Sequence, residues 1–148
     1  MPEKKTLERA ARDKREGKSA STQAGEFVKE EIENIREGEH GAKSAKQAIA
    51  IGLSKARRAG VDLKPPAKGK TSEKTRRSAQ QAYSKGQKHE PISKKRSAAS
   101  EKALQKEPAA AASHAALSRQ AHTAAKKRTA SERTASAKKA AATRKNNN

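Results

Sequence analysis

The chain has 148 residues, of which 36 are Lys or Arg and 16 are Asp or Glu, so its formal net charge is +20 and its pI is near 10.5. Aromatic residues make up 1% of the sequence and there is no Cys, which excludes a disulfide framework, a thiolate nucleophile and a Cys-containing zinc site. Because only 31% of the residues are hydrophobic and most of these are Ala, we expect too little apolar surface to order the whole chain.

Three helices are predicted in the first part of the chain, over residues 7–16, 23–37 and 44–60. Each starts near a Ser or Thr that can cap its free N–H groups and ends at a glycine that can adopt the left-handed conformation. The predicted caps are Thr6, Ser21 or Thr22, and Ser44, and the predicted stops are Gly17, Gly38 and Gly60. The second and third helices also repeat apolar residues at four-then-three spacing, which indicates one buried face. These residues are Val28, Ile32 and Ile35, then Ile49, Leu53 and Ala56.

The composition changes at the Pro65-Pro66 pair, which disfavours helix on its N-terminal side. Residues 1–65 carry 15 basic and 11 acidic side chains, whereas residues 66–148 carry 21 basic and 5 acidic ones and few large apolar ones. We therefore predict a mainly α protein. Residues 1–65 would form a small, marginal unit of about three helices, and residues 66–148 a long basic tail that is largely disordered or only transiently helical.

The basic residues of the tail occur in short clusters spread along a low-complexity background of Ala, Ser and Thr. A Lys or Arg that meets a backbone phosphate displaces condensed cations, so such a tail favours salt-dependent binding that ignores sequence. Together with two arginines of the third predicted helix, the predicted nucleic-acid-binding residues are Arg57, Arg58, Arg76, Arg77, Lys94, Lys95, Arg96, Lys126, Lys127, Arg128, Lys138, Lys139, Arg144 and Lys145.

Other interpretations of the first part of the chain are weaker. Helices two and three could form a helix-turn-helix, although their connection is longer than usual. Its exposed face would carry Lys46, Gln47, Ser54, Lys55, Arg57 and Arg58. The segment Gly38-Glu39-His40-Gly41 matches the G-x-x-G loop of an RNA-binding module, but Glu39 puts negative charge where phosphate would sit, and we expect an ordinary turn.

The sequence indicates no catalytic, metal or cofactor site. The four histidines are scattered along the chain and are expected to be exposed. The carboxylates of the second helix are expected to pair with Lys29, Arg36 or the basic tail. Ser78, Ser131 and Ser136 follow arginines and could accept phosphate, which would weaken polyanion binding. We therefore expect a protein that is not an enzyme and has no small-molecule substrate.

No stretch approaches the roughly 18 consecutive apolar residues of a membrane span, and the first five residues lack the apolar segment of a secretory signal. With no Trp and a single Phe, the chain is also poorly suited to lie on a lipid surface. We expect a cytoplasmic protein without a membrane partner.

The segment KQAIAIGLSKA, residues 46–56, resembles a helix shared by a family of small basic bacterial proteins of uncharacterised function. The similarity extends over residues 1–77. Members of that family often carry an Ala/Lys-rich tail similar to that of linker-histone-like bacterial proteins. The resemblance implies DNA binding but no defined binding or catalytic residues.

The leading hypothesis from the sequence is a nucleoid-associated, histone-like protein that binds DNA non-specifically through phosphate contacts. RNA or ribosome association is one alternative, because phosphate binding alone does not separate the two nucleic acids. A stress-protective disordered protein is another, since a hydrophilic, Ala/Lys-rich chain suits that role.

Overall fold

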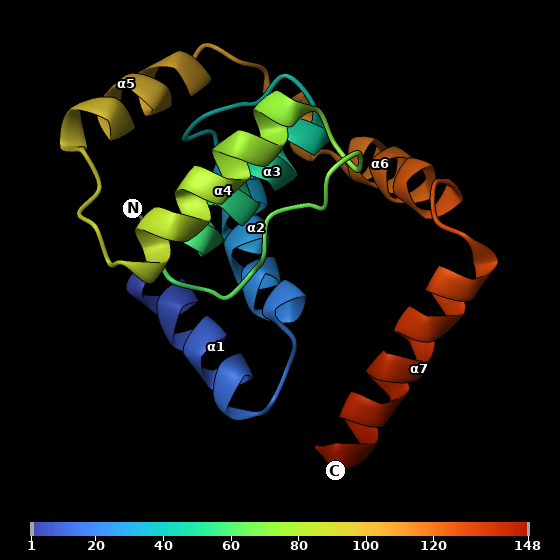
Figure 1. Cartoon of the computed structure of the whole chain (residues 1–148). Coiled ribbons are helices and arrows are strands. Elements are labelled where there is room, and N and C mark those ends of the chain that lie inside the picture. The colour runs from blue at the N-terminus through green and yellow to red at the C-terminus, as the bar shows by residue number, and fades with distance from the viewer. Residues whose placement is uncertain (1, 148) are drawn as a thin grey trace.

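Short polar side chains cap the N-termini of most helices of this protein. A computed structural model describes residues 2–147. Within that range the chain forms seven α-helices and one 3-10 helix and has no strand. A Ser or Thr side chain accepts a backbone N–H at the start of α2 to α7. The elements, shown in Figure 1, are α1 (Lys4–Arg15), α2 (Ala20–Arg36), α3 (Ala45–Arg58), α4 (Glu73–Gln87), α5 (Lys94–Leu104), η1 (Ala109–Ala112), α6 (His114–Lys126) and α7 (Ala130–Asn146).

The three predicted helices correspond to α1, α2 and α3, with differences at their starts. Ser44 caps α3 as predicted, at 3.1 Å from the Gln47 nitrogen. The Gln47 side chain accepts from the Lys43 nitrogen at 2.6 Å. The cap of α2 is Ser19 instead of Ser21 or Thr22, and α1 starts after Glu3, which leaves the predicted cap Thr6 inside the helix. The predicted glycine stops are confirmed, with φ of +75°, +83° and +96° at Gly17, Gly38 and Gly60.

The core consists of two adjacent clusters in which small side chains outnumber large ones. Phe27 is 1% exposed and is surrounded by residues of α1, α2, α3 and the turn that follows α3. Ile35 is fully buried and forms the second cluster with residues of the α2–α3 connection, α3 and η1. The other buried members are Ala10, Ala24, Ala56 and Val61 in the first cluster, and Ala42, Ala48, Ala111 and Ala112 in the second.

The predicted disordered tail is wrong, because helices continue through residues 66–147 and part of this segment joins the core. Helix α4 packs along α3 and buries Ala79, Ala82 and Gly86. The segment around η1 is attached to the α2–α3 connection by two backbone hydrogen bonds, from Gly41 N to Leu104 O at 2.9 Å and from Ala42 N to Pro108 O at 3.0 Å. The physical reason is that alanine and glycine allow helix backbones to approach closely, so packing here does not need large apolar side chains.

Tyr83 fixes α4 to the turn that follows α3. Its hydroxyl donates to Asp62 Oδ1 at 2.6 Å, and Lys64 Nζ donates to the same hydroxyl at 3.2 Å. The hydrogen bond from Tyr83, followed by the charge of Lys64, lowers the pKa of Asp62. Residues on both sides of Pro65 therefore contribute to one set of contacts.

Helices α2 and α3 lie close together at Gly52. A Cβ atom at this position would lie 2.6 Å from Val28 Cα. We expect Gly52→Ala to lower the free energy of unfolding by about 1–3 kcal/mol, because the two backbones must separate. Gly25→Ala is the matched control, since it is a helical glycine of α2 with nothing within 4 Å of its Cβ position. It should raise stability by roughly 0.5–1 kcal/mol through helix propensity. Urea unfolding followed by circular dichroism measures the free energy of unfolding of both variants. If the two substitutions changed it in the same direction, the close packing at Gly52 would be contradicted.

Each helix within residues 2–147 is too short or too polar to cross a lipid bilayer.

Candidate nucleic-acid interface

The two arginines predicted from the third helix are occupied inside the fold. Arg57 is 8% exposed and donates to the carbonyls of Leu63 at 3.1 Å and Lys64 at 3.3 Å. Burial lowers the pKa of its guanidinium. Arg58 is half-buried and donates to the carbonyl of Pro91 at 3.3 Å. Both side chains hold backbone segments in place, so we do not include them in the interface.

The helix-turn-helix interpretation does not fit the surroundings of α3. Helix α4 lies along α3, where a Cβ atom at Gly86 would fall 1.7 Å from the carbonyl oxygen of Arg57. Figure 1 shows the two helices side by side. Lys55, expected on the exposed face, instead reaches Glu31 Oε2 at 2.7 Å. The second half of α3 is therefore used for packing and has little surface left for a groove.

A buried ionic cluster joins α2, α3 and their connection. Glu31 is fully buried, with Oε1 at 2.6 Å from His40 Nε2 and Oε2 at 2.7 Å from Lys55 Nζ. His40 Nδ1 also lies 3.0 Å from the carbonyl oxygen of Gly41. The expectations that His40 is exposed and that Glu31 pairs with Lys29, Arg36 or the tail are wrong. His40 is covered because the α2–α3 connection folds over α2, beneath the segment around η1.

The predicted residues of α4 and α5 are mostly exposed. Arg76 is half-buried and lies 3.3 Å from Glu73 Oε1, whereas Arg77 is exposed. The remaining three, Lys94, Lys95 and Arg96, are exposed in the first turn of α5. These cations can contact a polyanion that lies against the folded part of the chain.

The other predicted residues lie in the C-terminal arm, the name used here for residues 113–147. Helix α6 contacts η1 and α3, while α7 extends away from the folded core (Figure 1). Every residue of α7 is exposed except Thr143, which is half-buried. The arm brings seven predicted cations together: Lys126, Lys127, Arg128, Lys138, Lys139, Arg144 and Lys145.

The start of α7 is defined by a capping box that the sequence analysis missed. The Thr129 side chain accepts from the Glu132 nitrogen at 3.1 Å, and Glu132 Oε2 accepts from the Thr129 nitrogen at 2.9 Å. The hydrogen bond from the Thr129 backbone lowers the pKa of Glu132. Thr followed three residues later by Glu was the signal that could have revealed this helix.

Two arginines fix the junction between α6 and α7. Arg128 Nη2 donates to the carbonyl of Glu132 at 2.9 Å and also to Ser136 Oγ. Arg133 Nη1 donates to the carbonyls of Ala125 at 3.1 Å and Arg128 at 3.2 Å. Arg133 was not among the predicted binding residues, although it lies in the same basic run and is exposed.

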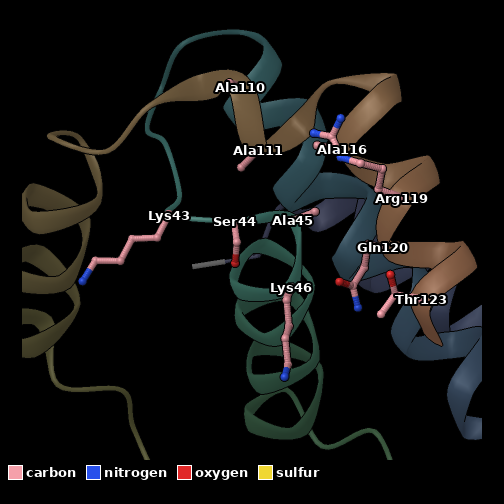
Figure 2. A pocket seen from close by; sticks show the side chains of 10 residues that line it. All are labelled: Lys43, Ser44, Ala45, Lys46, Ala110, Ala111, Ala116, Arg119, Gln120 and Thr123. Carbon is pink, nitrogen blue, oxygen red and sulfur yellow. The ribbon is translucent and has the colours of Figure 1, made fainter. Parts of the chain in front are cut away.

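A hollow of about 370 Å³ separates the start of α3 from α6. Figure 2 shows Lys43 and Lys46 leaving the start of α3 in different directions, with Arg119 projecting from α6 on the other side. Because these cations do not converge on one point, the hollow lacks the geometry of a dedicated anion site. Lys43 and Lys46 extend the basic surface of the arm onto the folded part of the chain.

Among residues 2–147, no three His, Cys, Asp or Glu side chains come together so that they could hold a metal ion. The chain matches no protein-family model, no curated protein and no solved structure. The charge and geometry of the C-terminal arm are therefore the main indication of function.

Proposed function

We propose that the protein binds nucleic acid non-specifically through backbone phosphates, with DNA as the main partner and the C-terminal arm as the main contact. The observation that supports this most strongly is α7, a 17-residue helix whose side chains are nearly all exposed and which carries five basic residues and one acidic residue. A helix that has no buried residue and whose cations repel one another is stabilised when phosphates neutralise those charges.

The cations of α4, α5 and the hollow beside α3 would add contacts once the arm is bound. A nucleoid-associated, histone-like role in the cytoplasm follows from such binding, because contacts with phosphates carry no sequence information. The same contacts would hold RNA, which is the second candidate partner. Stress protection by a disordered chain has less support, since the structure is helical from α1 to α7.

A salt series tests this proposal directly. Binding of the full chain to a fluorescent 30-base-pair DNA duplex would be measured by anisotropy between 50 and 200 mM NaCl. If about eight cations contact phosphates at once, affinity should fall by roughly four decades over this range. Failure to bind DNA or RNA at 50 mM NaCl would disprove the proposal, and affinity that does not change with salt would disprove the phosphate mechanism.

A further inference from the structure

Four of the five basic residues of α7 lie in two rows along the helix, and the fifth, Lys139, lies on the opposite side. Successive residues are rotated by about 100°, so residues seven or eleven positions apart return to nearly the same side. Lys138 and Lys145 therefore form one row, and Arg133 and Arg144 form the other. Arg133 donates to the carbonyls of Ala125 and Arg128, so it would exchange these bonds for bonds to a phosphate. The two rows are separated by about 120° around the helix axis. A flat anionic surface could be reached by one row at a time, whereas a trough with two anionic walls could be reached by both.

The surface between the two rows is narrow and smooth. It consists of Ala130, Thr134, Ala137 and Ala141, which are all exposed. The Thr134 hydroxyl donates to the carbonyl of Ala130 at 2.9 Å, so its hydrogen is used within the helix. The single carboxylate of α7, Glu132, lies on the opposite side. We call the surface between the rows the inner face of α7.

This inference rests on the proposed function and narrows its partner: we propose that α7 binds in the major groove of duplex DNA, with its inner face toward the base edges and its two rows on the phosphates of the two strands. The major groove is about 12 Å wide and admits one α-helix. The walls of the groove are phosphate backbones, which match the two rows in charge and in direction. Small side chains such as Ala let the helix approach the floor of the groove and contact thymine methyl groups.

Single strands fit this protein less well than a duplex does. Proteins that bind single strands stack bases on aromatic side chains. This chain has one Phe, one Tyr and no Trp. Phe27 is 1% exposed, and the Tyr83 ring has Lys64 Nζ 5.5 Å from its centre and its hydroxyl bonded to Asp62. Duplex RNA also fits poorly, because its major groove is too deep and narrow for side chains to read.

The first test places negative charge on the inner face. The variant Ala137→Glu/Ala141→Glu would be compared with Ala135→Glu/Ala142→Glu, whose positions lie on other sides of the same helix. Both variants change the net charge equally, and Glu is a good helix former, so circular dichroism should be unchanged. We expect the inner-face variant to lose about tenfold more affinity for duplex DNA than its control, because only its carboxylates would face the groove. Equal losses would overturn the groove geometry.

The second test changes the probe while the wild-type protein stays the same. Affinity would be measured for one sequence as duplex DNA, as duplex RNA, as single-stranded DNA and as duplex DNA with bulky groups on pyrimidine C5, which project into the major groove. We expect the unmodified duplex DNA to bind at least tenfold more tightly than the other three. Equal binding of the C5-modified duplex or of duplex RNA would overturn the inference and leave the proposed function standing. Binding to none of the four would overturn both.

Discussion

Replacing the five basic residues of α7 with Gln should weaken binding to duplex DNA roughly 10²- to 10³-fold at 150 mM NaCl. The five are Arg133, Lys138, Lys139, Arg144 and Lys145. If four of them contact phosphates, their loss should reduce the slope of log affinity against log salt by about 3.6, which corresponds to this range of affinity. Gln has a helix propensity close to that of Lys and Arg, so the helix itself should persist. Fluorescence anisotropy over a salt series measures the affinity and the slope together.

The matched control removes five exposed cations from α1 instead. Lys4, Lys5, Arg12, Lys14 and Arg15 are all exposed, and their replacement by Gln changes the net charge by the same amount. Since the Debye length is about 8 Å at this salt concentration, charges that do not contact DNA should change affinity only about threefold. Equal losses in the two variants would show that overall charge and not the C-terminal arm determines binding. An unchanged slope in the α7 variant would place the contacts elsewhere.

The second large effect is expected at the buried ionic cluster. Glu31→Gln keeps the shape of the side chain but removes the charge that faces His40 and Lys55. We expect a loss of roughly 3 kcal/mol in the free energy of unfolding, the lower end for breaking a buried ion pair, because Lys55 remains partly in contact with water. Urea unfolding followed by circular dichroism, with the fluorescence of Tyr83 as a probe of α4, measures this loss.

Glu33→Gln is the control for this substitution. Glu33 lies on the same helix, but it is exposed and its nitrogen–oxygen distance to Lys29 is 4.0 Å. Its replacement should cost less than about 1 kcal/mol. A double-mutant cycle with Lys55→Met would isolate the Glu31–Lys55 interaction. If Glu31→Gln were as mild as Glu33→Gln, the cluster would not contribute to stability.

The sequence pattern predicted that α2 and α3 exist, because large apolar residues recur along each at helical spacing. It predicted their buried faces only in part: Ile35 and Ala56 are buried, whereas Val28, Ile32, Ile49 and Leu53 are half-buried. It could not predict α4, whose buried residues are Ala79, Ala82 and Gly86. Small residues of this kind are equally common in exposed helices of low complexity, so they carry no signal of burial.

The sequence predicted the exposed cations of the candidate site but not the residues whose partners lie far away in the chain. The exposed cations of the arm follow directly from the charge clusters in the sequence. The role of Arg57 could not be predicted in this way, because its partners are the backbone carbonyls of Leu63 and Lys64, and every residue type has a backbone carbonyl. The burial of His40 depends on Glu31, nine positions earlier on α2, and on the segment around η1 that follows much later in the chain. Contacts of this range leave no periodic pattern in the sequence.

The arginines at the α6–α7 junction have a mechanical consequence. Arg128 and Arg133 fix the angle between the two helices through carbonyls that a phosphate can replace as a hydrogen-bond acceptor. A phosphate that binds either guanidinium therefore competes with the hydrogen bonds that hold the α6–α7 junction rigid. In a molecule bound in this way, the angle between α6 and α7 would no longer be fixed. The folded part of the protein could then rotate relative to the nucleic acid that holds α7.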